Sequence, residues 1–204
     1  MANRIEGKSR REENTEATRA ALLASAQDAF AKQGFGRSST EAIARAARVS
    51  RGAFYHHFAD KKALFDAVVI SLQIMAVDRV SERALQENDL WDRLYAGLDA
   101  YLEVCMEPVY ARIVVRDARA VLGEERFMKI EGDYTVALLR ANLAALHKAG
   151  RLAVDDPELL SQMVDAMVCR LAMTLQTDGA APDQRDRCRD TLRSLLDGLK
   201  TGGD

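Results

Sequence analysis

The sequence of 204 residues has few of the residues that interrupt helices or cross-link chains. It contains three prolines and three cysteines, and aromatic residues make up 6% of it. No stretch alternates apolar and polar residues with period two, so we expect no β-strand of useful length. No apolar run approaches the ~18 residues that a membrane span needs. These absences argue against a β-protein, a disulfide scaffold and a membrane protein, and favour a helical globular chain.

The cysteines Cys105, Cys169 and Cys188 are odd in number, widely spaced and without a CxxC pair. Each lies in an apolar helical pattern, which favours small buried side chains in a reducing cytosol over a redox sensor. The chain opens with charged residues and no apolar segment, so we expect no signal peptide and a cytoplasmic protein.

Charge is distributed unevenly along the chain, whose net charge is −2. Residues 1–62 hold 12 Lys and Arg against 7 Asp and Glu, whereas the remainder holds 17 against 24. A basic N-terminal part and an acidic body suggest two functions on one chain, so a nucleic-acid partner stays possible despite the overall sign. The alternative explanation is chance clustering.

Apolar residues at helical spacing predict helices along nearly the whole chain, and hence an all-α fold. The expected ranges are about 15–33, a short helix after Ser38 and Ser39, 51–57, a long helix after Asp60, and then 89–106, 108–121, 124–149, 157–177 and 183–200. Gly34 should end the first helix. The expected N-caps of the next three helices are Ser39 or Thr40, then Ser50, then Asp60.

The stretch VSRGAFYHHFADKKALF, residues 49–65, places several rings on the second of two short helices joined by a turn. Such a pair is a helix-turn-helix, whose second helix lies in the DNA major groove. Phe54 and Phe58 share one helical face and would anchor the helix. Tyr55 and His56 project to other sides and carry donors suited to phosphate oxygens or base edges.

Small and polar residues around this helix also favour DNA as the partner. Gly52 and Ala53 would let the N-terminus of the helix approach a phosphate closely. Lys61, at the start of the next helix, can reach a flanking phosphate, and so can Ser39 and Thr40 at the head of the preceding one.

Two other chemistries have weaker support. His56 and His57 could suggest a metal site, but adjacent helical residues diverge by about 100° and no carboxylate or cysteine is spaced to complete it. A cysteine-dependent enzyme using Cys105 or Cys169 with His147 would need a base or an oxyanion site beside the thiol, and the sequence places neither there. We therefore expect no enzyme, no metal and no cofactor.

Residues of about 15–65, including TRAALLASAQDAFAKQGFGRSSTEAIARAARVSRGAFYHHFADKKALF, resemble the TetR family of transcriptional regulators. The GF pair, the Ser/Thr pair and the pattern IA.AA.VS.G.FY.HF..K..L fit without a gap. The resemblance implies a helical homodimer with a variable C-terminal domain that binds a small effector. The DNA-contacting positions of the family fall on Ser39, Thr40, Arg51, Gly52, Ala53, Tyr55, His56, His57 and Lys61.

The resemblance implies two domains: a helix-turn-helix DNA-binding domain over 1–62, joined by a long helix to a helical effector-binding and dimerisation domain over 63–204. Arg48 stands where the family usually has glycine. If this position keeps a positive φ, Arg48 costs on the order of 1 kcal/mol there, or it offers a cation near the backbone. The basic tail with Arg4, Lys8, Arg10 and Arg11 is either a solvated tail, which we favour, or a minor-groove arm.

The last two predicted helices carry apolar stripes that pack either inside their own subunit or against a two-fold copy as a four-helix bundle. The family resemblance favours the homodimer. The expected interface residues are Leu160, Met163, Met167, Leu171, Leu192, Leu195 and Leu199.

Aromatic and sulfur-containing side chains of the central helices either fill the core or line a cavity for an apolar or aromatic effector. The expected cavity residues are Trp91, Tyr95, Tyr101, Cys105, Phe127 and Tyr134. The stretch VVRDARAVLGEERF at 114–127 weakly resembles the C-terminal domain of one branch of the family. The expected function is a repressor that an effector releases from a palindromic operator in double-stranded DNA; an activator or scaffold with the same fold is the alternative.

Overall fold

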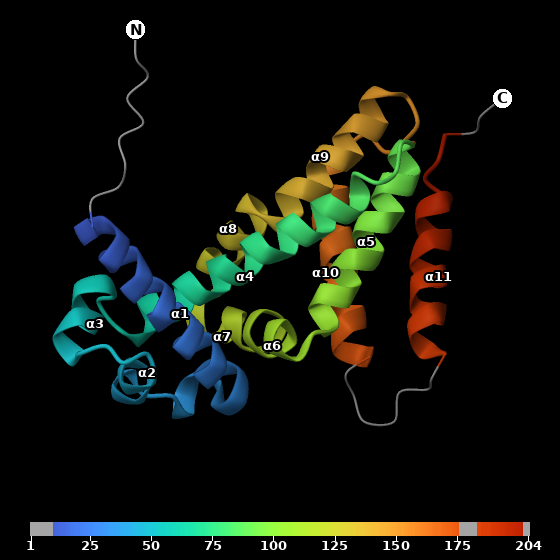
Figure 1. The fold of residues 1–204 in the computed structure, drawn as a ribbon. Coiled ribbons are helices and arrows are strands. Elements are labelled where there is room, and N and C mark those ends of the chain that lie inside the picture. The colour runs from blue at the N-terminus through green and yellow to red at the C-terminus, as the bar shows by residue number, and fades with distance from the viewer. Residues whose placement is uncertain (1–9, 176–182, 202–204) are drawn as a thin grey trace, which may run out of the picture. The chain divides into compact units, whose positions relative to one another are not determined.

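The computed structural model describes residues 10–175 and 183–201, and nearly all of these residues are helical (Figure 1). The helices are α1 (Arg10–Arg37), α2 (Thr40–Ala46), α3 (Arg51–His57), α4 (Lys61–Ala84), α5 (Leu90–Met106), α6 (Pro108–Tyr110), the π-helix η1 (Ala111–Ala118), α7 (Arg119–Leu122), α8 (Glu124–Asp133), α9 (Thr135–Lys148), α10 (Pro157–Leu175) and α11 (Gln184–Asp197). The predicted all-α fold is confirmed. None of the helices described is long and apolar enough to cross a membrane.

The chain forms two compact units, one up to Val68 and one from Val69, and α4 runs through the boundary. The first unit is built around the rings of Phe30, Phe35 and Phe65. Their centroids lie 5.1–5.9 Å apart, and two of the three pairs meet edge to face, which is the arrangement that aromatic quadrupoles favour. Gly34 has a φ of 77° and interrupts the helical path of α1, as predicted.

The predicted N-caps of α2, α3 and α4 are present. The side chain of Ser39 accepts a hydrogen bond from the backbone N–H three residues later, at 3.2 Å, so Ser39 rather than Thr40 caps α2. Ser50 does the same for α3 at 3.2 Å, and Asp60 does so for α4 at 2.7 Å. Each cap satisfies an N–H that has no partner inside its helix.

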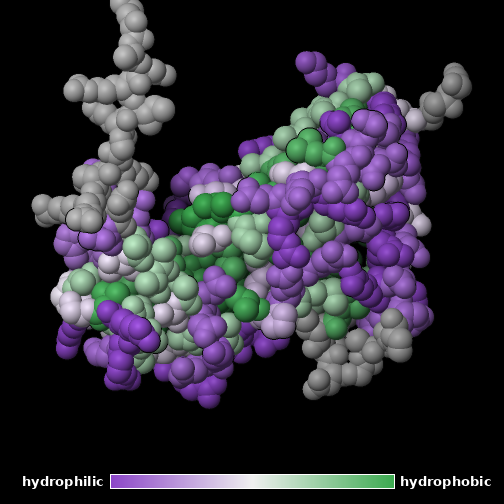
Figure 2. Space-filling model, in the orientation of Figure 1, coloured by the Kyte–Doolittle hydropathy of each residue, from purple (hydrophilic) through white to green (hydrophobic). Residues whose placement is uncertain are grey.

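The second unit has α5, α9 and α10 at its centre, and α11 lies along α5 (Figure 1). Tyr95 donates a hydrogen bond to Asp197 at 2.6 Å, and Arg185 pairs with Glu103 at 2.8 Å. Hydrophilic residues accordingly predominate over α5 and α11 on the face that Figure 2 shows.

Two of the predicted helices, 108–121 and 124–149, are not continuous α-helices in the structure. The single helix expected over 124–149 is broken at Tyr134, whose φ of −123° and ψ of −95° are not helical, so α8 and α9 are separate. Between α6 and α7 the chain follows the wider turn of the π-helix η1. Apolar residues continue on both sides of each irregularity, so the hydrophobic period does not reveal it. The basic residues Arg4 and Lys8 of the tail lie outside the described residues.

Arg48 has a φ of 57°, in the left-handed region that favours glycine. We therefore expect Arg48→Gly to raise the free energy of unfolding by about 1 kcal/mol, because the Cβ atom causes the strain. Arg45→Gly, in helical backbone at the exposed end of α2, should lower it by about 0.5–1 kcal/mol. Urea denaturation measures both. An Arg48→Gly chain no more stable than wild type would mean that Arg48 makes compensating contacts.

Candidate functional site

The helix α3 divides its aromatic residues between the core and the surface. Phe54 is 1% exposed and Phe58 is 5% exposed, whereas Tyr55 is 45% exposed. The ring of Tyr55 stands edge-on to Phe54, with centroids 5.1 Å apart. The prediction that Phe54 and Phe58 are buried anchors while Tyr55 is presented to the surface is confirmed.

Glu41, in the first turn of α2, organises the polar side chains beside α3. Its carboxylate accepts a hydrogen bond from the Thr40 hydroxyl at 3.2 Å and lies 4.0 Å from the guanidinium of Arg51. Its own backbone N–H and then the Thr40 hydroxyl hold the pKa of Glu41 below its usual value. Arg51 also lies over the ring of Tyr55, at 5.8 Å. An approaching phosphate would compete with Glu41 for both Thr40 and Arg51, a feature that the sequence analysis missed.

A shallow groove runs between α1 and the start and outer face of α3. It is lined by Asn14, Thr15 and Thr18 of α1 and by Gly52, Ala53, His56 and His57 of α3. A Cβ added at Gly52 would meet no atom within 4 Å, so the backbone there is open to a ligand. His56 is exposed. The pKa of His57 is lowered, first by partial burial and then by the charges of His56 and Arg19. His57 is therefore held closer to its neutral form.

Lys61 has a structural role that the sequence analysis did not anticipate. Its ammonium donates hydrogen bonds to the backbone carbonyls of Phe35 at 2.8 Å and Ser38 at 2.9 Å. It also lies 4.3 Å from the centroid of the Phe35 ring. Because an ammonium has three donors, one remains for a phosphate. Lys61 thus ties α4 to the end of α1 and the start of α2.

We expect Lys61→Ala to lower the free energy of unfolding by about 1–3 kcal/mol, because two buried or half-buried carbonyls lose their donor. Lys62→Ala is the matched control, since Lys62 is exposed on the same turn, and it should change the free energy by less than about 0.5 kcal/mol. Chemical denaturation of both variants measures the difference. Equal stabilities would show that the carbonyls are satisfied equally well by water.

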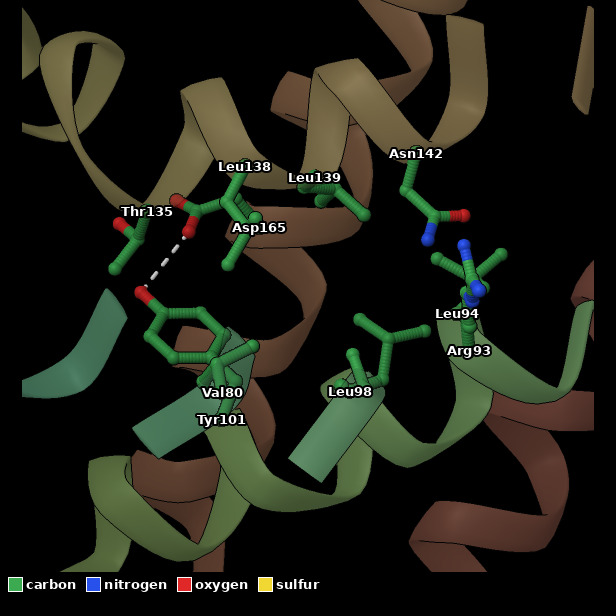
Figure 3. A pocket seen from close by; sticks show the side chains of 12 residues that line it. Val80, Arg93, Leu94, Leu98, Tyr101, Thr135, Leu138, Leu139, Asn142 and Asp165 are labelled. Atoms are coloured by element: carbon green, nitrogen blue, oxygen red, sulfur yellow. Dashed lines mark hydrogen bonds between the residues drawn. The ribbon is translucent and has the colours of Figure 1, made fainter. Parts of the chain in front are cut away.

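The second unit contains two neighbouring cavities that share Asp165 of α10. The inner cavity, of about 60 Å³, is shown in Figure 3. Its walls are Val80, Ala84, Arg93, Leu94, Gly97, Leu98, Tyr101, Thr135, Leu138, Leu139, Asn142 and Asp165. Tyr101 donates a hydrogen bond to Asp165 at 3.0 Å across it, and Thr135 lies near both (Figure 3).

The lateral cavity is larger, about 660 Å³, and lies between η1, α7, α8 and α10. Its walls include the apolar residues Val114, Val115, Ala120, Phe127, Met128, Val136, Ala166 and Met173 and the polar residues Arg116, Arg119, Glu124, Glu131, Glu158, Gln162, Asp165, Cys169 and Arg170. A volume of this size is typical of a small-molecule site.

Of the six predicted effector residues, the structure brings two to these cavities: Tyr101 to the inner one and Phe127 to the lateral one. Trp91 and Tyr95 are buried elsewhere, with the ammonium of Lys200 5.2 Å from both ring centroids. Cys105 is fully buried, and Tyr134 marks the break between α8 and α9.

Buried carboxyl groups are the main feature that the sequence analysis missed. Glu131 and Asp165 are each 7% exposed, and both reach the lateral cavity. Burial and, to a smaller extent, the neighbouring Asp165 raise the pKa of Glu131 to about 8. Burial also raises the pKa of Asp165 to about 6, against the Tyr101 hydrogen bond. The sequence contained one sign of this arrangement. Asp165 lies four residues from Ser161 and four from Cys169, so the three polar side chains share one face of α10.

The predicted interface residues divide between the interior and the surface of the second unit. Leu160 and Leu192 are buried, whereas Met163 is 56% exposed and Leu195 is 57% exposed. Met167, Leu171 and Leu199 are half-buried. Met167, Leu171, Leu192 and Leu195 line a hollow along α10 and α11.

Comparison with known proteins identifies the family. The profile of "Bacterial regulatory proteins, tetR family" matches residues 22–68, and that of "Tetracyclin repressor-like, C-terminal domain" matches residues 91–199. The Transposon Tn10 TetC protein of Escherichia coli is 24% identical over 96% of this chain and 99% of its own length.

Solved structures agree with this assignment. A TetR-family transcriptional regulator from Pectobacterium atrosepticum is 30% identical, covers 97% of this chain and 100% of its own, and has a TM-score of 0.76. RolR, solved in complex with resorcinol, shares the fold at 18% identity, with 91% and 90% coverage and a TM-score of 0.69. The predicted absence of enzymatic activity agrees with relatives that are regulators. The chain belongs to the TetR family and is a DNA-binding transcriptional regulator.

Proposed function

We propose that this regulator is a homodimeric repressor acting in the cytoplasm, where a small organic effector releases it from a palindromic operator. The unit up to Val68 would bind DNA, and the unit from Val69 would bind the effector and the second copy. The observation that carries the DNA-binding part is the construction of α3, whose anchors Phe54 and Phe58 are buried while Tyr55 and His56 stay exposed. The description of the matched C-terminal profile as tetracyclin repressor-like supports repression.

The proposed readers of DNA fall into two groups. Arg51 and His56, at exposed positions of α3, would contact base edges in the major groove. The proposed phosphate contacts are Ser39 and Thr40 of α2, Gly52, Ala53, Tyr55 and His57 of α3, and Lys61 of α4. Ser39 accepts a hydrogen bond from the backbone, so its hydroxyl proton remains available as a donor.

Exposed apolar side chains on α10 and α11 support the proposed dimer. Met163 and Leu195, together with Leu159 at 53% exposure and Met173 at 42%, leave apolar surface that a second copy would cover. Two such helices from each copy form a four-helix bundle.

The lateral cavity supports an organic effector. RolR, which has the same fold, was solved with resorcinol bound, and a cavity of about 660 Å³ would accommodate a molecule of that size or larger. Phe127 and the neighbouring valines supply apolar walls. Phe127 would contact the effector directly, whereas Tyr101, which lines the inner cavity, would act on it through its hydrogen bond to Asp165.

The DNA interface is tested by fluorescence anisotropy over a range of salt, on an operator selected from random duplexes and on a scrambled duplex. Arg51→Ala or His56→Ala should weaken operator binding by about 1–3 kcal/mol and leave scrambled-duplex binding nearly unchanged. Tyr55→Phe keeps the ring and should weaken both duplexes equally if the hydroxyl contacts a phosphate. Phe54→Ala should instead destabilise the fold by about 3–5 kcal/mol. Wild-type affinity in all three reader variants would refute the assignment of α3.

The dimer is tested by Met163→Glu and Leu195→Glu. Both side chains are exposed within one copy, so each variant chain should still fold. In the dimer the new carboxylate would be buried without a partner, which should weaken the free energy of dimerisation by several kcal/mol. Leu85→Glu, at a position 71% exposed in the turn that follows α4, is the control and should remain dimeric. Sedimentation velocity distinguishes the two states. A dimeric Met163→Glu, Leu195→Glu double variant would exclude this face as the interface.

A further inference from the structure

Two carboxyl groups and a thiol converge on the wall of the lateral cavity. The ligand atoms of Glu131 on α8 and of Asp165 and Cys169 on α10 all lie within 4.8 Å of one another. Both acidic residues are 7% exposed. Like charges so close and so little hydrated repel each other, so the pair is suited to a positively charged partner.

A further polar group, beside Asp165, lacks a hydrogen-bond partner within the described residues. Thr135 is 7% exposed, and its hydroxyl makes no hydrogen bond within the described residues. It lines the inner cavity beside Asp165, where Figure 3 shows it on the same side as the Asp165 carboxylate. A buried hydroxyl without a partner costs free energy, which a bound polar molecule can recover.

Arg119 shows how a cation fits this wall. Its guanidinium lies over the ring of Phe127, 5.0 Å from the centroid, and 3.9 Å from a Glu131 oxygen. It also pairs with Glu124. A cation between an aromatic face and a carboxylate is the arrangement by which proteins recognise ammonium groups. The Arg119 side chain is 55% exposed, so it can yield this place to a ligand.

The geometry points to an organic cation as the ligand of the lateral cavity: an amine or quaternary ammonium on an apolar or aromatic body. The charge would lie between Glu131 and Asp165, and the body would pack on Phe127. The site itself is independent of the DNA-binding proposal, although the ligand's role as effector rests on the proposed function.

A metal ion is the competing occupant of the same three residues. The size and apolar walls of the cavity favour the organic cation, because an ion would leave most of the 660 Å³ unfilled. Moreover, Asp165 already accepts a hydrogen bond from Tyr101, and the set contains no histidine, the commonest metal ligand in proteins.

Binding of a cation should be coupled to release of a proton. With its pKa raised to about 8, Glu131 holds a proton at about pH 7 and must lose it to pair with a cation. Affinity should therefore rise with pH up to about 8 and level off above it. The other charged or titratable groups around the site are Arg116, Arg119, Glu124, Glu158, Arg170, Tyr101 and Cys169. The glutamine variant of Glu131 isolates its contribution from theirs.

Calorimetry and thermal melting on the full chain, without DNA, test the site with shape-matched probes. Phenyltrimethylammonium is compared with neutral tert-butylbenzene, and benzyltrimethylammonium with neopentylbenzene. The cations should bind at least about tenfold more tightly than their isosteres. Glu131→Gln and Asp165→Asn should remove that preference, and Glu131→Gln should also remove the rise in affinity up to about pH 8. Glu125→Gln, at an exposed position on α8, should retain both.

Glu131→Gln should fold normally, because near neutral pH it replaces a protonated carboxyl with a neutral group of the same shape. The proposal is overturned if neither cation exceeds its neutral isostere, or if both carboxyl variants bind cations as wild type does. It is also overturned if ZnCl₂ alone raises the melting temperature and Cys169→Ala removes that effect. Addition of the cations to the operator complex is a separate measurement: cation binding without release of DNA would support the site and refute its role as effector site.

Discussion

The length of α3 is the constraint on which DNA recognition depends. A helix of seven residues is unstable by itself in water, so the unit around it must fix its position. Phe54 and Phe58 do so by burial, and Ser50 does so by capping the first turn. Lys61 extends this support, because it joins α4 to the backbone of Phe35 and Ser38. A residue that the family resemblance assigns to DNA is thus also part of the scaffold that positions α3.

The second unit has a different constraint, which is the presence of carboxyl groups inside an apolar bundle. Burial raises the pKa of both Glu131 and Asp165, and Asp165 contributes to the raised pKa of Glu131. Such groups reduce the stability of an unliganded protein, and near neutral pH Glu131 limits that cost by staying protonated. In the proposed site, a bound cation would neutralise these carboxylates and so offset the free-energy cost of burying them. A ligand that stabilises one conformation of the protein in this way shifts the population toward that conformation.

The sequence predicted the fold better than it predicted the cavity, for physical reasons. Apolar spacing and caps such as Ser50 and Asp60 are local, so they identify helices and their starts. The break at Tyr134 and the π-helix η1 leave that spacing almost unchanged and were missed. The cavity was sought among aromatic residues, but rings such as Trp91 and Tyr95 fill the core equally well. Charged residues on a helix are usually solvated, and only the packing of α8 against its neighbours shows that Glu131 is buried.

The helix α10 connects the two proposed activities of the second unit. It directs Asp165 and Cys169 into the lateral cavity while Leu159 and Met163 remain exposed for a second copy. Asp165 and Met163 are two residues apart, so they lie on different faces of the same rigid element. In the proposed dimer, a ligand that draws α10 toward Glu131 of α8 would therefore move the interface helix itself. The irregular backbone at Gly123 and Tyr134, at the two ends of α8, is where such a displacement could be absorbed, since regular helices transmit a shift rather than dissipate it.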